Sequence, residues 1–277
     1  MIKACVIGSP IMHSRSPLIH GFWLKQLGVA GRYERILVEP PDLKDFLTQL
    51  RANGYVGCNV TLPHKETALA FIDRIDESVK AIGALNTVYV KSGQTHATST
   101  DGEGFLQNLI ASVPNYDIAR KNIILLGAGG SAKALIERLL RANVRSITVA
   151  NRTLARAQDL TVLFGQKIIP VEPSALNLKF CDVLVNTTSQ GMSGQPELDI
   201  DISTLPSHAV VADIVYVPLK TNLIHSAETL GFRTVPGLGM LLHQAVRGFE
   251  LWFGVKPVVT PELYNLIAHD IDSDYKP

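Results

Sequence analysis

Cysteine is scarce in this chain, and neither a surplus of charge nor a long apolar run is present. The 277 residues include three cysteines. Each lies in an apolar, strand-like run, which is typical of reduced core residues rather than disulfides or ligands. Basic residues are interspersed with acids at a formal net charge of +1, so a nucleic-acid partner is not expected. No segment stays uncharged long enough to span a bilayer, and the start, MIKACVIG, reads as a strand rather than a leader. We therefore expect a cytoplasmic protein with no membrane partner.

Patterns of metal sites and hydrolases are also missing. The eight histidines form no His-x-x-x-His pair, and GMSG at 191–194 lacks the spacing of a nucleophile elbow. We expect no bound metal. Hydrophobic residues make up 46% of the chain and charged residues 18%, which is typical of an ordinary globular protein. The length is too great for one mononucleotide-binding half and favours two domains.

A glycine-rich turn follows an apolar strand at residues 121–132, KNIILLGAGGSA. Gly127 permits the tight turn, Gly129 lets backbone N–H groups approach a pyrophosphate, and the small Ala132 lets the next helix pack closely. Apolar residues then recur at helical spacing, so a helix N-terminus is expected to face the anionic phosphates. The residues expected to bind the cofactor at this turn are Gly127, Ala128, Gly129, Gly130, Ser131 and Ala132.

The end of the following strand indicates which dinucleotide is bound. Residues 146–153 read SITVANRT, with no carboxylate to hold the ribose hydroxyls of NAD. Asn151, Arg152 and Thr153 stand there instead, and Arg156 follows one helical turn later. Guanidinium groups suit a 2′-phosphate. The sequence therefore predicts NADP as the cofactor.

Strand-like and helical runs alternate along the chain, which predicts an α/β fold. The first hundred residues contain the strands ACVIG, YERILVE and YVGCNVT, with helices from Pro17 and near Leu43. A second series runs from Lys121 through ITVAN, CDVLVNTT and AVVADIVY to a short strand at Phe232. Two further helices, MLLHQAVRGFELWFG and one from Thr260, end the chain.

Polar residues gather at turns in the first part of the chain, where function separates most easily from packing. HSRSP gives Ser14 and Ser16, one of which could cap the following helix instead of facing a ligand. NVTLPHKE places Asn59 and Thr61 at the end of a strand and Lys65 just inside a helix. A lysine at that place opposes the helix dipole.

Two further polar clusters follow before the glycine turn. ALNTV gives Asn86, and STDGEG gives Thr100 and Asp101 at a strand-to-helix turn, where Asp101 could also be a structural N-cap. NTTSQGM at 186–192 and DIVYVPLKT at 213–221 lie at the ends of the next strands, and GLGMLLHQA at 237–245 lies at the start of the first of the final helices.

Taken in this order, these motifs closely resemble the shikimate dehydrogenase family over nearly the whole chain. The resemblance implies an NADP-dependent oxidoreductase that reversibly reduces 3-dehydroshikimate to shikimate, a step toward chorismate and the aromatic amino acids. It also implies a substrate domain of residues 1–103 plus 240–277, a Rossmann-like NADP domain of residues 104–239, and a cleft between them. Ser99 is a departure, because many relatives carry Asn there.

The family pattern implies a role for individual residues. Lys65 and Asp101 are expected to be the catalytic pair, with Lys65 donating a proton or stabilising an oxyanion and Asp101 orienting it. The residues expected to bind substrate are Ser14, Ser16, Asn59, Thr61, Lys65, Asn86, Asp101, Tyr216 and Gln244. The further residues expected near the nicotinamide are Thr188, Ile214, Gly237 and Met240.

Two alternatives stay open from the sequence. One is a broader quinate/shikimate dehydrogenase, although Ser16 favours shikimate as the substrate. The other is a catalytically silent, ligand-binding regulatory relative, against which the presence of both Lys65 and Asp101 argues. The sequence is compatible with a monomer and with a homodimer.

Overall fold

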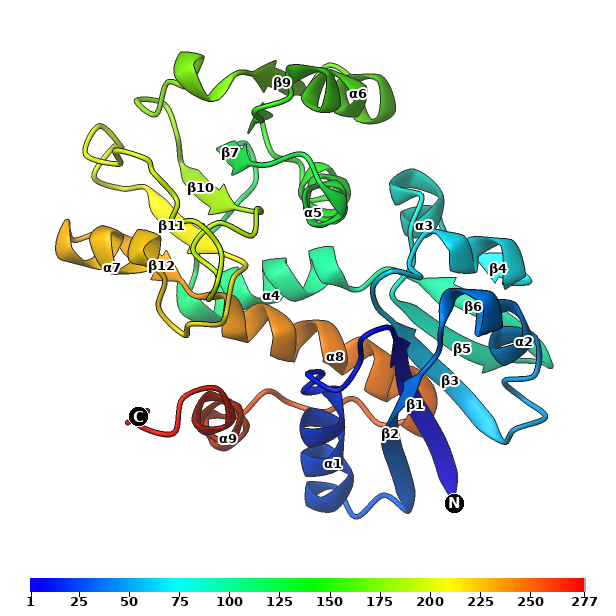
Figure 1. The fold of residues 1–277 in the computed structure, drawn as a ribbon. Coiled ribbons are helices and arrows are strands. Elements are labelled where there is room, and N and C mark those ends of the chain that lie inside the picture. The colour runs from blue at the N-terminus through cyan, green and yellow to red at the C-terminus, as the bar shows by residue number, and fades with distance from the viewer. Residues whose placement is uncertain (277) are drawn as a thin grey trace. The chain divides into compact units, whose positions relative to one another are not determined.

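The computed structural model describes residues 1–276, which divide into two compact units (Figure 1). Unit 1 comprises Met1–Asp101 and Leu242–Ile267. Unit 2 comprises Gly102–Leu241 and the residues from Ala268 onward. Helix α8 (Gly237–Phe253) belongs to both units, because the division falls inside it.

Unit 1 is built on a mixed, six-stranded sheet of order β2-β1-β3-β5-β6-β4. Its strands are β1 (Ile2–Gly8), β2 (Gly31–Leu37), β3 (Tyr55–Val60), β4 (Arg74–Ile75), β5 (Thr87–Lys91) and β6 (Gln94–Thr98). Its helices are α1 (Ser16–Gln26), α2 (Leu43–Thr48), α3 (Glu77–Ile82) and the short 3-10 helices η1 (Pro40–Asp42) and η2 (Thr67–Phe71). Strands β1, β2 and β3 are parallel, whereas β5 is antiparallel to both of its neighbours.

Helices cover both faces of the unit 1 sheet. Leu43 and Leu47 of α2 and Val79 of α3 pack on one face with strand residues such as Ile7 and Val60. On the other face, α1 and the second half of α8 meet in an aromatic cluster of His20, Trp23, Tyr33, Phe249 and Trp252. Strand β3 carries Gly57 at this place, where a Cβ would lie 2.1 Å from Nε1 of Trp252.

Unit 2 contains a six-stranded, fully parallel sheet of order β12-β11-β10-β7-β8-β9. Its strands are β7 (Asn122–Leu126), β8 (Ser146–Ala150), β9 (Ile168–Val171), β10 (Val183–Asn186), β11 (Val210–Asp213) and β12 (Arg233–Val235). Its helices are α4 (Asp101–Ser112), α5 (Gly130–Arg141), α6 (Leu154–Phe164), α7 (Asn222–Thr229) and η3 (Pro173–Ala175). Helix α4 starts at the unit boundary, and α9 (Pro261–Ile271) spans the other boundary at Ala268. The strand order is that of a doubly wound dinucleotide-binding fold. Successive strands are added on one side of β7 up to β9 and then on its other side from β10 onward.

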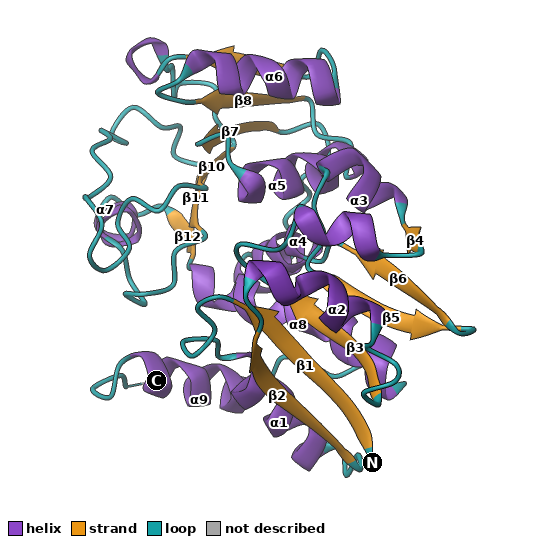
Figure 2. Cartoon of the chain, turned by 45° about the vertical axis from the view of Figure 1, so that its right-hand side comes forward, coloured by secondary structure: helices purple, strands orange, loops and turns teal. Residues whose placement is uncertain are grey.

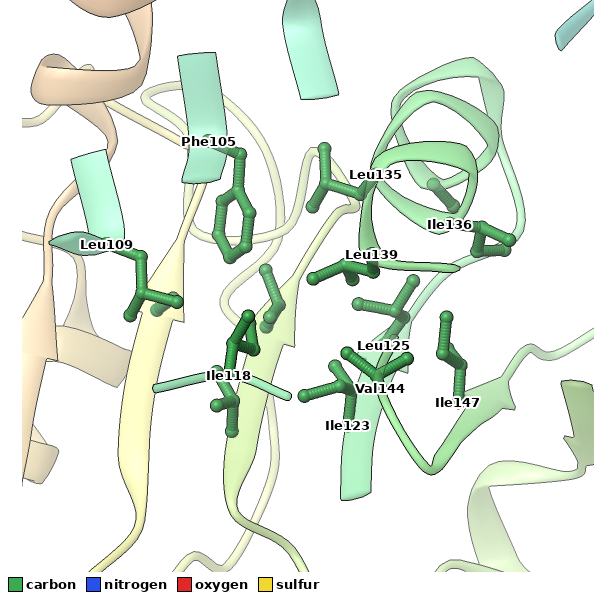
Figure 3. Packing of buried hydrophobic residues seen from close by; sticks show 14 of the residues in the cluster. Phe105, Leu109, Ile118, Ile123, Leu125, Leu135, Ile136, Leu139, Val144 and Ile147 are labelled. Atoms are coloured by element: carbon green, nitrogen blue, oxygen red, sulfur yellow. The ribbon is translucent and has the colours of Figure 1, made fainter. Parts of the chain in front are cut away.

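The unit 2 sheet is buried on both sides (Figure 2). Alternate residues of β7 point to opposite faces. Ile123 and Leu125 face the core that α4, α5 and α6 cover, and Ile124 and Leu126 face the core on the side of α7. Figure 3 shows Leu135 and the neighbouring apolar residues of α5 packed over this strand. This packing holds the turn between β7 and α5 on a rigid base.

The strands and helices that the sequence predicts form as expected, including β1, β2, β3, β7, β8, β10, β11 and β12. One prediction is wrong. Lys65 does not lie inside a helix, because residues 61–66 form turns and the 3-10 helix η2 begins only at Thr67. Pro63 lies in a turn and does not start a helix, and the peptide bond between Leu62 and Pro63 is cis.

The hairpin of β5 and β6 is absent from the sequence prediction. Ser92 and Gly93 both adopt positive φ, at 50° and 81°, which is the backbone of a tight hairpin turn. This hairpin has a direct effect on the polar clusters. Since Thr87 pairs with Thr98 across it, Asn86 and Thr100 end up next to each other.

Candidate functional site

Polar side chains of unit 1 gather at one edge of its sheet. Strand β1 ends there at Gly8, and the backbone N–H of Thr61, directly after β3, donates to the carbonyl of Ile7 over 3.0 Å. The hairpin brings the start of β5 and the end of β6 to the same edge. Gly8 has no side chain because a Cβ would lie 2.5 Å from Cγ2 of Thr61.

An ion pair stands at this edge between the predicted catalytic residues. Nζ of Lys65 lies 2.7 Å from Oδ2 of Asp101, and their side chains are 31% and 19% exposed. Asn86 donates to the other carboxylate oxygen over 2.8 Å. Asp101 is therefore held by two partners and in turn holds the ammonium group of Lys65, which remains accessible to a ligand.

Asn86 connects this pair to the sheet. Its side-chain nitrogen also donates to Oγ1 of Thr100 over 2.9 Å, and its side-chain oxygen accepts from the backbone N–H of Thr100 over 3.0 Å. Thr100 Oγ1 lies 3.4 Å from Oε1 of Gln244 on α8. The structure thus brings together Lys65, Asn86, Asp101 and Gln244, which the sequence predicts as site residues.

Asn59 lies behind these groups and is 6% exposed. Tyr33 donates to its side-chain oxygen over 2.6 Å, and its nitrogen donates to the carbonyl of Asn86 and to Oγ1 of Thr87, each over 3.1 Å. Both amide hydrogens of Asn59 are therefore used within the protein. A ligand can reach only the remaining lone pair of its oxygen.

Ser14 and Ser16 lie on the segment that leads from β1 into α1. Oγ of Ser14 accepts from the backbone N–H of Ser16 over 3.4 Å, whereas the N-cap residue of α1, Arg15, makes no side-chain cap hydrogen bond. Ser16 is the first residue of the helix and is 8% exposed. Arg35 fixes this segment by donating from Nε to the carbonyl of Ser14 over 2.7 Å.

The glycine turn in unit 2 has the geometry that a pyrophosphate needs. Gly127 has φ +104°, and a Cβ there would lie 2.8 Å from Cγ2 of Thr188. Gly129 and Gly130 are exposed, and a Cβ on either would meet no atom within 4 Å. No side chain caps α5. The first amides of this 12-residue helix and the open space beside the glycines therefore fit an anionic phosphate.

The residues after β8 have the chemistry that a 2′-phosphate needs. Asn151 donates from its side chain to the carbonyl of Thr153 over 2.8 Å, which shapes the turn into α6. Arg152 and Arg156 are exposed, and Thr153 is the uncapped N-cap residue of α6. The residues present fit NADP better than NAD, since the turn has two cations and no carboxylate.

The remaining predicted cofactor residues lie on the loops and helix that follow β10, β11 and β12. Thr188 follows β10, Ile214 and Tyr216 follow β11, and Gly237 and Met240 lie in the first turn of α8. Ile214 and Met240 pack partly on the unit 2 core. A Cβ on Gly237 would lie 2.4 Å from the carbonyl oxygen of Val215, so this glycine is required for packing against the backbone.

Sequence reasoning missed a buried polar group at the ends of β10 and β11. Asn186 is fully buried and Asp213 is 2% exposed, and burial raises the pKa of Asp213 to about 6. The available signal was a polar residue at the end of each apolar strand, VLVN and VVAD. Tyr33 and Thr87, which hold Asn59, were also missed, because each reads as an ordinary strand residue.

The described residues also bear on metal sites and membrane-spanning helices. In the part of the chain that the structure describes, no cluster of three or more His, Cys, Asp or Glu side chains could hold a metal ion. Within residues 1–276 no helix combines the length and the apolar character needed to cross a membrane. The fold and the glycine turn define an α/β protein of the dinucleotide-binding class, with a second group of polar side chains at the edge of the unit 1 sheet.

Comparison with known proteins gives the family. The model of the shikimate dehydrogenase substrate binding domain matches residues 6–88, that of shikimate / quinate 5-dehydrogenase residues 109–196, and that of the shikimate 5′-dehydrogenase C-terminal domain residues 237–259. A shikimate dehydrogenase (NADP(+)) of Rhodopseudomonas palustris is 51% identical over 270 residues, which cover 97% of this chain and 96% of that protein. The chain belongs to the shikimate dehydrogenase family.

Solved structures agree with this assignment. The shikimate 5-dehydrogenase of Thermus thermophilus in complex with NADP(H) and shikimate has a TM-score of 0.85 at 33% identity, covering 98% of this chain and 100% of that chain. A quinate dehydrogenase from Corynebacterium glutamicum in complex with NAD has a TM-score of 0.87 at 30% identity, covering 96% and 98%.

Proposed function

We propose that this chain catalyses the reversible, NADPH-dependent reduction of 3-dehydroshikimate to shikimate, in the route to chorismate and the aromatic amino acids. It is an NADP-dependent oxidoreductase that acts on a CH–OH group. The observation that carries the proposal is the ion pair of Lys65 and Asp101 at a polar sheet edge, with 2.7 Å between Nζ and Oδ2. The free, buried cysteines fit a reducing compartment, and we place the enzyme in the cytoplasm.

The residues of unit 1 supply substrate binding and proton transfer in this proposal. Bound NADPH supplies a hydride to the ketone carbon, which leaves negative charge on the ketone oxygen. Lys65 donates a proton from Nζ to that oxygen. Asp101 keeps the ammonium group in position and accepts a hydrogen bond from a substrate hydroxyl. Asn86 fixes Asp101 through the 2.8 Å hydrogen bond to its Oδ1.

The remaining polar residues bind the substrate. We assign the carboxylate to the hydroxyls of Ser14 and Ser16, and the ring hydroxyls to Asn59, Thr61, Asn86 and Gln244. We also assign Tyr216 to substrate binding. Residues 1–103 plus 240–277 then form the substrate domain, and residues 104–239 form the cofactor domain. A site whose polar side chains match the hydroxyl groups of one substrate discriminates strongly against a substrate with a different pattern of hydroxyl groups.

The cofactor residues divide into a phosphate part and a nicotinamide part. We assign the pyrophosphate to the turn of residues 127–132 and the 2′-phosphate to Arg152, Arg156 and the neighbouring Asn151 and Thr153. We assign the nicotinamide to Thr188, Ile214, Gly237 and Met240. The support for this division is that α5 has no side-chain cap and that its flanking glycines leave open space.

Initial rates with two substrates and two cofactors test the proposal. The purified chain is assayed for oxidation of shikimate and of quinate, with NADP and with NAD. We expect turnover of shikimate with NADP. Comparable rates with quinate or NAD would place the chain in the broader quinate/shikimate class, and ligand binding without turnover would favour a silent regulatory relative.

Arg152 gives a separate test of cofactor choice. We expect Arg152→Ser to raise KM for NADP about 10-fold or more and to leave KM for NAD unchanged, because only the 2′-phosphate loses a charged partner. Arg145→Ser is the matched control, since Arg145 is also exposed and directly precedes β8 at its opposite end. Equal losses with both cofactors would contradict the assignment of Arg152.

A further inference from the structure

Two buried polar residues meet at the ends of neighbouring strands in unit 2. Asn186 is the last residue of β10 and Asp213 the last residue of β11, and the two are partners in the parallel register. Nδ2 of Asn186 donates to Oδ1 of Asp213 over 3.0 Å. This junction lies at the carboxyl edge of the sheet, where doubly wound folds bind their ligands.

Asn186 fixes the loop that follows its own strand. Its side-chain oxygen accepts from the backbone N–H of Thr188 over 3.0 Å and from Oγ1 of Thr188 over 2.7 Å. Its nitrogen also donates to the carbonyl of Gln190 over 3.0 Å. Asn186 thus holds Thr188 at two points, and Asp213 holds Asn186 in turn.

Asp213 fixes the loop after β11 in the same way. Oδ1 accepts from the backbone N–H of Val215 over 2.9 Å, and Oδ2 accepts from Oγ1 of Thr221 over 2.7 Å. Thr221 also caps α7, so its position is fixed on both sides. The two loops are joined once more where Ser193 N–H donates to the carbonyl of Val217 over 2.9 Å.

We propose that Asp213 is a positioning residue for the reaction, which acts through Asn186 and the backbone of Val215 to hold Thr188 and Ile214 against the nicotinamide end of the cofactor. The inference rests on the proposed function of those two residues. A buried carboxylate that accepts three hydrogen bonds gathers donors from two loops at one point, which an apolar side chain of the same size cannot do.

Burial of the Asp213 carboxylate is unfavourable for the stability of the fold. Asp213 is 2% exposed, and no ion pair to it is found within residues 1–276. Burial raises its pKa to about 6, while the hydrogen bonds from Val215, Thr221 and Asn186 act in the opposite direction. The unfavourable burial is therefore only partly offset.

The location of the network decides which kinetic constant depends on it. The phosphates are assigned to the turn after β7 and to Arg152 after β8, which lie on other strands of the sheet. Cofactor affinity is then retained when the loops after β10 and β11 shift. The distance and angle of hydride transfer are not retained, and a misplacement of about 1 Å lowers a rate by about 100-fold.

Two substitutions at the same position separate hydrogen bonding from charge. Asp213→Ala removes all three acceptor contacts. Asp213→Asn can keep them, because its oxygen accepts from Val215 and Asn186 while its NH2 group donates to the hydroxyl of Thr221. We expect Asp213→Ala to lower kcat for shikimate oxidation about 10-fold or more, with the Kd for NADPH within about 3-fold of wild type. We expect Asp213→Asn to restore kcat to within about 3-fold of wild type.

Asp182→Ala is the matched control. Asp182 directly precedes β10 at its opposite end and also accepts three contacts, from Asn122 N–H at 2.8 Å, His208 Nε2 at 3.1 Å and Lys121 Nζ at 3.4 Å. Removing it also breaks a polar network in the same sheet, but we expect kcat to stay within about 2-fold of wild type, since its contacts lie far from the assigned nicotinamide residues along the strand.

Three results would overturn the proposal: an unchanged kcat in Asp213→Ala, an equal loss of kcat in Asp182→Ala, or an Asp213→Asn variant as slow as Asp213→Ala. If Asp213→Ala does not fold, Asn186→Ala removes the side chain through which Asp213 holds Thr188, and an unchanged kcat there would overturn the proposal as well. Failure of the proposed function is distinguishable, because the wild-type chain would then not oxidise shikimate at all.

Discussion

Lys65 stands in a turn after β3, and its ammonium group pairs with the carboxylate of Asp101. We expect Lys65→Ala to lower kcat for shikimate oxidation about 100-fold or more, because the developing oxyanion loses its proton donor. Stability is expected to change by about 1 kcal/mol or less, since the pair is partly exposed. Initial rates and thermal unfolding followed by circular dichroism measure the two effects.

Lys80→Ala is the control for this prediction. Lys80 lies in α3 of the same unit and pairs with Glu77 over 2.7 Å, but its side chain is 55% exposed and belongs to none of the polar clusters. We expect full activity in this variant. An active, folded Lys65→Ala enzyme would remove Lys65 from the chemistry.

Asp213 gives a prediction on the pH dependence of stability. Its pKa rises from 3.8 in the unfolded chain to about 6 in the folded protein because the carboxylate is buried. A group with a raised folded pKa binds its proton more readily in the native state, so its contribution to stability falls as pH rises from about 4 to 6. This loss reaches about 3 kcal/mol, since a tenfold difference in proton affinity between the two states corresponds to about 1.4 kcal/mol.

The Asp213→Asn variant measures this loss directly. Urea unfolding of wild type and variant is compared at pH 4 and pH 7, so that all other titrating groups cancel. We expect the variant to gain stability relative to wild type by up to about 3 kcal/mol between the two pH values. A difference that does not change with pH would mean that Asp213 titrates normally.

Motifs identify single residues better than they identify contacts. The sequence alone indicates Lys65, Asp101 and Arg152 as functional, because each stands in a recognisable motif. It does not indicate that Asn86 donates to Asp101, since this contact depends on the register of a hairpin that the sequence pattern did not predict. The role of Asp213 was missed for the same reason: its partner Asn186 lies 27 positions away in the chain.

At the scale of elements, the turn between β7 and α5 combines two different uses of glycine. We expect Gly127→Ala to destabilise the fold by about 1–3 kcal/mol, because φ is +104° and the new methyl would lie 2.8 Å from Cγ2 of Thr188. We expect Gly129→Ala to keep its stability, since its φ of −89° is ordinary and a Cβ would meet no atom within 4 Å.

Gly129→Ala is also expected to weaken the binding of NADPH. The methyl group of Gly129→Ala would occupy the space assigned to the phosphates, so the Kd for NADPH should rise about 10-fold or more. Gly21→Ala in α1 is the control, because a Cβ there also meets no atom within 4 Å and unit 1 is not assigned to the cofactor. NADPH fluorescence titration measures all three, and tight binding by Gly129→Ala would contradict the phosphate assignment.

Elements with a strong apolar period were predicted correctly, and short polar ones were not. Strands such as VLVN and NIILL are buried on both faces and read as apolar runs. Strand β6, QTHAT, has few apolar residues, and its strand conformation depends on pairing with β5. The error at Lys65 has a similar cause, since the turn of residues 61–66 has no apolar period to reveal it.

At the scale of the whole molecule, the sequence predicts two domains but not how helices are shared between them. The predicted boundaries at 103 and 239 stay a prediction about function, whereas the two compact units meet after Asp101, after Leu241 and after Ile267. Helix α8 begins against the backbone of Val215 in unit 2 and ends with Phe249 and Trp252 in the core of unit 1. One continuous helix thus contributes to the packing of both units.

This shared helix predicts that the two units unfold together. The two tryptophans, Trp23 and Trp252, both lie in unit 1, whereas the cofactor residues are assigned to unit 2. Ligand at 100 times its Kd stabilises a cooperative protein by about 2.7 kcal/mol, or about 5 °C in Tm. We therefore expect NADP to raise the Tm seen by tryptophan fluorescence and by circular dichroism equally, and Arg152→Ser to weaken both shifts. If NADP leaves the Tm measured by tryptophan fluorescence unchanged, unit 1 unfolds independently, because the ligand then stabilises only unit 2.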